Sequence, residues 1–168
     1  MINRLARAFR HLTTSRASGR RRFPVDTLQA IRAAIAEGEV LHRAEVRVIV
    51  EASLDCEAVF RGMSARERAS ELFTLYRIWD TEENCGVLIY INLADRRVEI
   101  ITDRGLAKCV SAEEWQAVCR TMTQGFARND YHGSVLAGVR QLNALLAERF
   151  PENRSAYSDQ LPNQPVLL

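Results

Sequence analysis

The sequence predicts an α/β fold, a three-layer α/β/α sandwich built on a small mixed sheet. Residues 85–93 form a nearly continuous apolar run, as expected of a strand that is buried on both faces. A second apolar run at residues 98–101 follows a turn-like polar cluster at residues 95–97, a pattern typical of a hairpin. Capping boxes at residues 64–67 and 111–114 open a helix on each side of this hairpin.

The elements before the hairpin follow from spacing and residue type. Pro24 suits a first helical turn, and apolar residues then recur with helical spacing at Leu28, Ile31 and Ile35. We therefore expect a helix from residue 24 to about residue 41. The β-branched and largely apolar stretch at residues 46–54 predicts the first strand. The helix of the first capping box continues to about Tyr76.

The elements after the hairpin are two helices. The first runs from the second capping box to Phe126, and the last carries apolar residues from Val135 to Phe150. The predicted order is therefore α-β-α-β-β-α-α. A helix joins the first two strands, which favours a right-handed parallel crossover. The third strand is then antiparallel to the second, and helices cover both faces of the sheet.

Charge divides the chain into parts. Residues 1–22 carry seven arginines and no acid, which leaves 16 basic against 21 acidic residues, or −5, in residues 23–168. We expect a basic leader, a folded domain at residues 23–151 and a disordered tail at residues 152–168. Residues 15–22 are expected to be a flexible linker. The acidic charge of the domain argues against a nucleic-acid partner.

The leader has two open interpretations. Ile2, Leu5, Phe9 and Leu12 fall three or four residues apart, with arginines on another face. As a helix, the leader is basic and amphipathic and suits an anionic membrane surface or an acidic protein partner. As a solvated chain end, it frays and has no such role.

Several classes of protein are excluded by what the sequence lacks. No apolar segment approaches the length of about 20 residues that a membrane span needs, and none follows the arginines as in a secretory signal. The four cysteines show no C-x-x-C spacing, which is typical of free thiols in a reducing compartment. Glycine-rich nucleotide loops are also absent, so we expect no nucleotide cofactor. A cytoplasmic protein, peripheral to a membrane, is the expectation.

Polar side chains gather at one predicted edge of the sheet. The hairpin returns Asp103 to the edge at which Asn84 begins the first hairpin strand. A parallel first strand starts at the same edge and brings His42 and Glu45 there. An antiparallel first strand would bring Ser53 and Asp55 instead, and that alternative stays open at this point.

The residue types at this edge predict a cation site. Thr81 and Glu39 join the cluster, and carboxylate, amide and hydroxyl oxygens are the ligands that Ca²⁺ or Mg²⁺ prefer. His42 is the candidate general acid or base. The alternative is structural: Glu45 pairs with a neighbouring arginine, and Asp103 caps the turn before Gly105.

A set of residues in this order also carries a family resemblance. The set comprises Glu39, His42, Glu45, Ala69, Leu72, Phe73, Thr81, Asn84, residues 86–89, Asp103, Gly105, Trp115, Phe126, Tyr131, Gly133 and Gly138. From residue 23 to residue 151 the chain resembles the TPM domain, named for thylakoid, photosystem-repair and nematode receptor-modulating members. The resemblance implies an α/β sandwich. Cys85 stands where the commonest form has a second asparagine.

The resemblance implies two classes of function. Plant members are described as acid phosphatases, some members as binding Ca²⁺, and many bacterial members as lying at or near a membrane. One hypothesis is a binding or assembly module, responsive to Ca²⁺, that docks a protein partner or a membrane surface. The other is a metal-assisted acid phosphatase that acts on phosphomonoesters, with the cation at Asp103, Glu45 and Asn84 and with His42 transferring the proton.

Overall fold

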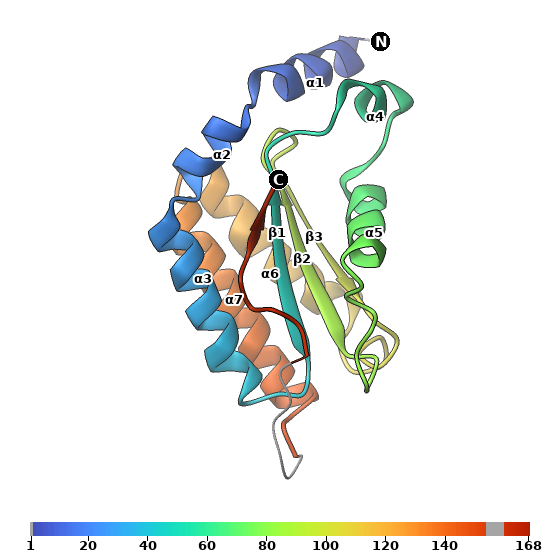
Figure 1. The fold of residues 1–168 in the computed structure, drawn as a ribbon, viewed down its shortest axis with the longest axis vertical. Helices are drawn as coiled ribbons and strands as arrows, with labels where there is room; N and C mark the ends of the chain where they lie inside the picture. Colours follow the sequence, from blue (N-terminus) through green and yellow to red (C-terminus); the bar gives the residue numbers. More distant parts are fainter. Residues whose placement is uncertain (1, 154–159) are drawn as a thin grey trace.

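The core of the fold is a mixed sheet with helices on both faces (Figure 1). The computed structural model describes residues 2–153 and 160–168. In this described part the sheet has the strand order β3-β2-β1-β4. The strands are β1 (Glu45–Glu51), β2 (Gly86–Asn92), β3 (Arg97–Thr102) and β4 (Val166–Leu167).

The strand directions match the prediction. β1 is parallel to β2, with Glu45 opposite Gly86, and β2 is antiparallel to β3. The connection from β1 to β2 runs through α4 (Cys56–Arg61) and α5 (Ala65–Leu75). The parallel first strand is therefore confirmed, and Ser53 and Asp55 do not join the predicted edge.

Helices cover the two faces of the sheet unequally. α3 (Val25–Glu39), α6 (Ala112–Ala127) and α7 (Tyr131–Arg149) lie on one face, and α5 lies on the other (Figure 1). The capping boxes predicted for α5 and α6 are both formed. This arrangement confirms the predicted α/β sandwich.

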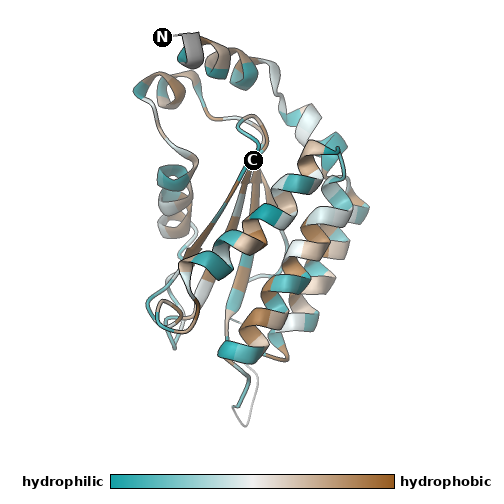
Figure 2. Ribbon diagram, turned by 180° about the vertical axis from the view of Figure 1, so that it is seen from behind, coloured by the Kyte–Doolittle hydropathy of each residue, from teal (hydrophilic) through white to brown (hydrophobic). Residues whose placement is uncertain are grey.

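Strand β2 supplies both halves of the apolar core because its side chains alternate between faces. Val87, Ile89 and Ile91 pack in the cluster that includes α3, α6 and α7, whereas Leu88 and Tyr90 pack in the cluster that includes α5. All seven residues of β2 are buried, and Figure 2 shows the central strands as strongly apolar.

The leader is folded onto the domain. It forms α1 (Ile2–Thr13), and residues 15–22, expected to be a linker, instead form α2 (Arg16–Arg22). The Ser15 side chain caps α2 by accepting the backbone N–H of Ser18. Ser18 and Gly19 are buried, so the contacts of this turn with the domain hold the segment that was predicted to be flexible.

The expected disordered tail also differs from the structure. Residues 154–159 lie outside the described residues, but β4 adds a parallel strand to the outer edge of β1. The Leu168 N–H donates to Val50, and the Ala52 N–H donates to Leu168. β1 has free backbone groups on that edge, and pairing satisfies them.

The start of β2 generates a stability prediction. A Cβ atom on Gly86 would overlap the backbone carbonyl of Ile78, whereas one on Gly19 would sit 3.5 Å from its nearest neighbours. Gly86→Ala should therefore lower the free energy of unfolding by about 3 kcal/mol, because backbone must move. Gly19→Ala, inside a helix, should be neutral or stabilise by up to about 1 kcal/mol. Urea unfolding measures both, and a Gly86→Ala variant as stable as wild type would contradict this packing.

Candidate functional site

Backbone hydrogen bonds bring the residues of the predicted edge together. The Asp103 N–H donates to the Gly86 carbonyl at 3.0 Å, while Glu45 pairs with Gly86 from the other side. The Gly105 N–H donates to Asn84 at 2.9 Å. The structure therefore brings Glu45, Asn84 and Asp103 to one edge, as the parallel pairing predicted.

Most predicted ligands at this edge already have protein partners. Glu45 Oε2 accepts the backbone N–H groups of Gln160 and Leu161, each at 3.1 Å. Glu39 Oε1 accepts the Val46 N–H at 2.8 Å, and Thr81 Oγ1 accepts the Cys85 N–H at 2.9 Å. These three side chains hold strand ends and loops in place.

Asn84 is exposed at the start of the hairpin, and Asp103 is the buried exception. Its Oδ1 accepts the Arg104 N–H at 2.6 Å, but its Oδ2 is buried and has no hydrogen-bond partner within the described residues. A buried carboxylate oxygen without a partner is costly and calls for an explanation. Within residues 2–153 and 160–168, however, no three or more His, Cys, Asp or Glu side chains are grouped so that they could hold a metal ion.

His42 is fully buried beside α7. Its Nδ1 lies 3.1 Å from the Ala44 carbonyl, and its Nε2 lies 3.3 Å from Asn143 Oδ1. Asn143 in turn donates to the Ala34 carbonyl at 2.7 Å, which fixes its amide. Burial lowers the pKa of His42, although these oxygens oppose the shift. Its catalytic role stays a prediction, and its observed role is to join β1 to α7.

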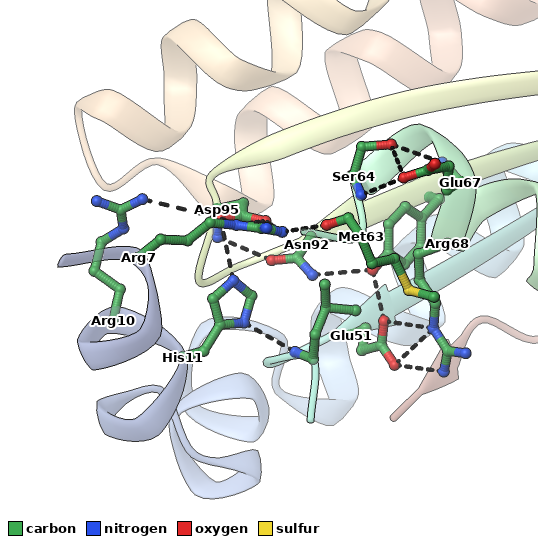
Figure 3. Close-up of polar contacts among 12 residues, drawn as sticks. Arg7, Arg10, His11, Glu51, Met63, Ser64, Glu67, Arg68, Asn92 and Asp95 are labelled. Carbon is green, nitrogen blue, oxygen red and sulfur yellow. Dashed lines mark hydrogen bonds and ion pairs between the residues drawn. The ribbon is translucent and has the colours of Figure 1, made fainter. Parts of the chain in front are cut away.

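The opposite edge of the sheet, at the carboxyl ends of β1 and β2, holds a buried polar network (Figure 3). Tyr90 Oη donates to Glu51 Oε2 at 2.5 Å, and Asn92 Nδ2 donates to Tyr90 Oη at 2.9 Å. Arg68 on α5 donates to Glu51 Oε1 at 2.7 Å. Burial and the Glu51 carboxylate raise the pKa of Tyr90 far above its usual value, so the phenol stays protonated. The network links α5 to both central strands.

Asp95, in the turn after β2, extends this network to α1 (Figure 3). Its N–H donates to Asn92 Oδ1 at 2.9 Å. Its carboxylate receives two N–H groups of Arg7, from Nε at 2.9 Å and from Nη2 at 2.7 Å. His11 Nε2 lies 3.1 Å away, and Arg10 lies at 3.9 Å. We call Asp95, Arg7 and His11 the α1 latch.

Two backbone contacts complete the α1 latch. Arg7 Nη2 also donates to the Met63 carbonyl at 2.7 Å, and His11 Nδ1 accepts the Leu54 N–H at 3.0 Å. His11 is buried. Burial alone would raise the pKa of Asp95, but the contacts with His11 and Arg7 outweigh it and hold that pKa well below its usual range. The Asp95 carboxylate is therefore charged at neutral pH.

The α1 latch turns the polar face of α1 inward and its apolar face outward. Leu5, Phe9 and Leu12 are 62%, 68% and 68% exposed, whereas Ala8 is buried against α4 residues such as Val59. An ordinary surface helix buries its apolar stripe. We call Leu5, Phe9 and Leu12 the apolar ridge of α1.

The sequence contains a signal for the α1 latch on each side of the contact. Arg7 and His11 are four residues apart and so share one helix face. Asn92 and Asp95 follow a buried strand directly, where polar side chains gather. The pairing of these two groups joins positions 88 residues apart, which local spacing does not predict.

These features define a small α/β sandwich with a latched basic helix at one end of its sheet. A family model described as the TPM domain matches residues 22–145, and the chain belongs to the TPM domain family. The fold is similar to the NMR structure of the BA42 protein from the psychrophilic bacterium Bizionia argentinensis, with a TM-score of 0.73 and 25% identity over 84% of this chain and 92% of that one. No curated protein sequence matches the chain significantly.

The α1 latch generates a prediction about pH and stability. Asp95→Asn should lower the free energy of unfolding by about 3 kcal/mol at pH 7, because Arg7 loses a carboxylate partner whose side chain is only 9% exposed. The pKa of Asp95 is lower in the folded protein than in the unfolded chain, where it is about 3.9, so the ionised carboxylate stabilises the folded state above that pH. This stabilisation is lost as the pH falls below about 3.9 towards the folded pKa. The difference between wild type and variant in urea unfolding should therefore shrink from pH 5 to pH 3.

Asp80→Asn is the matched control for this measurement. Asp80 pairs with Arg77 at 2.6 Å on the surface, and both side chains are at least half exposed. Such a pair contributes at most about 1 kcal/mol. An Asp95→Asn variant that costs no more than Asp80→Asn would show that the α1 latch does not hold the helix.

Proposed function

We propose that this protein is a docking module that attaches to an anionic membrane surface through α1. The observation that carries the proposal is the apolar ridge of α1, which points outward although part-buried charged groups anchor the same helix. A helix held in this orientation presents Leu5, Phe9 and Leu12 together, at a fixed place on the domain. Interfacial helices bind membranes by burying such a face among the headgroups and acyl chains.

The apolar ridge offers enough surface for reversible binding. Full burial of a leucine or phenylalanine side chain contributes about 1.5–3 kcal/mol, so inserting these three partly exposed side chains contributes on the order of 3–6 kcal/mol. Each arginine near an anionic surface adds about 1 kcal/mol. Among the helices of the described residues, none has the length and apolar character of a membrane span.

The charge distribution of the chain favours an anionic lipid surface, and not a protein of mixed charge, as the partner of α1. Seven arginines and no acid lie in residues 1–22, and the remainder of the chain sums to −5. An anionic bilayer attracts the first part and repels the second, which orients the domain with α1 toward the membrane.

Vesicle co-sedimentation with paired leucine variants tests this proposal. Leu12 and Leu75 are 68% and 71% exposed, but Leu75 lies at the end of α5, outside the apolar ridge. Leu12→Ser should weaken binding to phosphatidylglycerol vesicles about tenfold, and Leu75→Ser should not change it. Neutral phosphatidylcholine vesicles should bind wild type weakly, because the arginines lose their partners.

Two results would contradict the docking function. The first is equal binding of the Leu12 and Leu75 variants, or no binding of wild type to anionic vesicles. The second is a concentration-dependent dimer that Leu12→Ser abolishes, which would assign the apolar ridge to a second copy of the chain.

A cation site at the opposite edge is the second candidate, because Asp103 Oδ2 is buried without a hydrogen-bond partner among the described residues. Asp103 would hold Ca²⁺ or Mg²⁺, with Glu45 and Asn84 at the same edge of the sheet, and a carboxylate of this kind suits either ion. The phosphatase hypothesis uses the same edge and needs His42 to transfer a proton. Both ring nitrogens of His42 face protein oxygens inside the fold, which favours the docking function over hydrolysis.

Titration followed by NMR tests the cation site without relying on activity. Millimolar Ca²⁺ or Mg²⁺ should shift the amide resonances of Glu45, Asn84 and Asp103, and Asp103→Asn should remove the shifts. Asp26→Asn, in the first turn of α3, is the control and should leave them unchanged. Absence of shifts in wild type would reject the cation site and leave the docking function standing.

A further inference from the structure

An arginine-rich hollow lies beside α1, between that helix, the start of α5 and strand β3. Its volume is about 540 Å³, within the range of small-molecule sites. Five arginines line it, together with two acids, Asp95 and Glu99. The arginines are Arg4, Arg7, Arg10, Arg66 and Arg97.

Some of this positive charge is already neutralised. Asp95 is held by Arg7 and lies 3.9 Å from Arg10, and Glu99 lies 3.7 Å from Arg66. Arg4 and Arg97 have no carboxylate partner in the part of the chain that the structure describes. They come from different elements, α1 and β3, and both line the hollow. The hollow therefore has a surplus of positive charge.

We propose that this hollow binds the phosphomonoester headgroup of an anionic lipid. The inference rests on the proposed function, because it names the class of lipid that the docking end selects. A phosphomonoester carries about −1.5 to −2 at pH 7, which matches two unpaired guanidinium groups, whereas a phosphodiester carries about −1. Guanidinium groups bind phosphate oxygens through two parallel hydrogen bonds.

The start of α5 adds to this preference. Ser64 and Ala65 line the hollow, and α5 begins at Ala65. The amino end of a helix carries partial positive charge and attracts phosphate. Glu67 of the capping box already accepts the N–H and the hydroxyl of Ser64, so the N–H groups that this helix end offers are those of Ala65 and Arg66.

The position of the hollow fits a lipid source for the phosphate. A helix with its side chains is about 10–12 Å across, and an interfacial helix enters the membrane by about 5–10 Å. When the apolar ridge is inserted, the inward face of α1 lies at the level of the headgroups. Arg7, which lines the hollow, is on that face. A headgroup can then enter the hollow while its acyl chains stay in the bilayer.

Binding to phosphatidic acid and phosphatidylglycerol vesicles of matched surface charge tests the inference. Wild type should bind phosphatidic acid vesicles about tenfold more tightly. Arg97→Gln should abolish this preference, so that both kinds of vesicle bind equally, and both should bind somewhat more weakly because one arginine near the anionic surface is lost. Arg140→Gln, at an exposed position on α7, is the matched control and should keep the preference.

A phosphate titration followed by NMR separates the lipid headgroup from free phosphate. Millimolar inorganic phosphate should shift the amides of Ala65 and Arg97 only weakly, because the acyl anchor is missing. Equal binding to the two kinds of vesicle, with Leu12→Ser still weakening both, would overturn the headgroup site and leave the docking function intact. Shifts at Ala65 and Arg97 without any vesicle binding would overturn the lipid source and the docking function together.

Discussion

The arrangement of the amino-terminal end depends on one part-buried carboxylate, that of Asp95, whose side chain is 9% exposed. Two N–H groups of Arg7 and the ring of His11 approach it from α1, and its own N–H is held by Asn92 at the end of β2. A helix with an apolar stripe normally packs that stripe on the core. Here the ion pair and the backbone contacts of Arg7 and His11 select the opposite orientation. The exposed apolar ridge follows directly from that selection.

Asp95 can fix the orientation of α1 because Asp95 itself is held by a polar network that continues into the sheet. Asn92 donates a hydrogen bond to Tyr90, and Tyr90 donates one to Glu51. Arg68 on α5 also donates to Glu51 and ends this chain of polar groups (Figure 3). Every member of such a network needs its partner, since an unpaired polar group in the interior is costly. The two edges of the sheet therefore differ. At the edge of Glu45, carboxylates accept backbone N–H groups of neighbouring strands and loops. At the edge of Asp95, the carboxylate binds side chains of α1 and so fixes the orientation of that helix.

Local sequence patterns predict the centre of this fold well. The apolar run of β2, the two capping boxes and the helix between β1 and β2 determined the layers and the parallel pairing, and hence the shared edge of Glu45 and Asp103. They do not predict α2 or β4, because contacts with the domain and with the free edge of β1 stabilise those elements. The hydrogen-bond partners of the side chains at the Glu45 edge were also not predicted. Glu45 accepts the N–H groups of Gln160 and Leu161, which lie more than a hundred residues away. The α1 latch was missed for the same reason.

The orientation of α1 on the domain is the central claim, and a spin-labelled lipid in anionic bicelles tests it directly. His11 is buried against the domain, while Phe9, two residues away, is exposed on the opposite face of the helix. Paramagnetic broadening should remove the NMR signals of the Phe9 ring and leave the His11 ring signals largely intact. Equal broadening of both residues would mean that α1 leaves the domain on binding. Broadening of neither would mean that the apolar ridge does not meet the membrane.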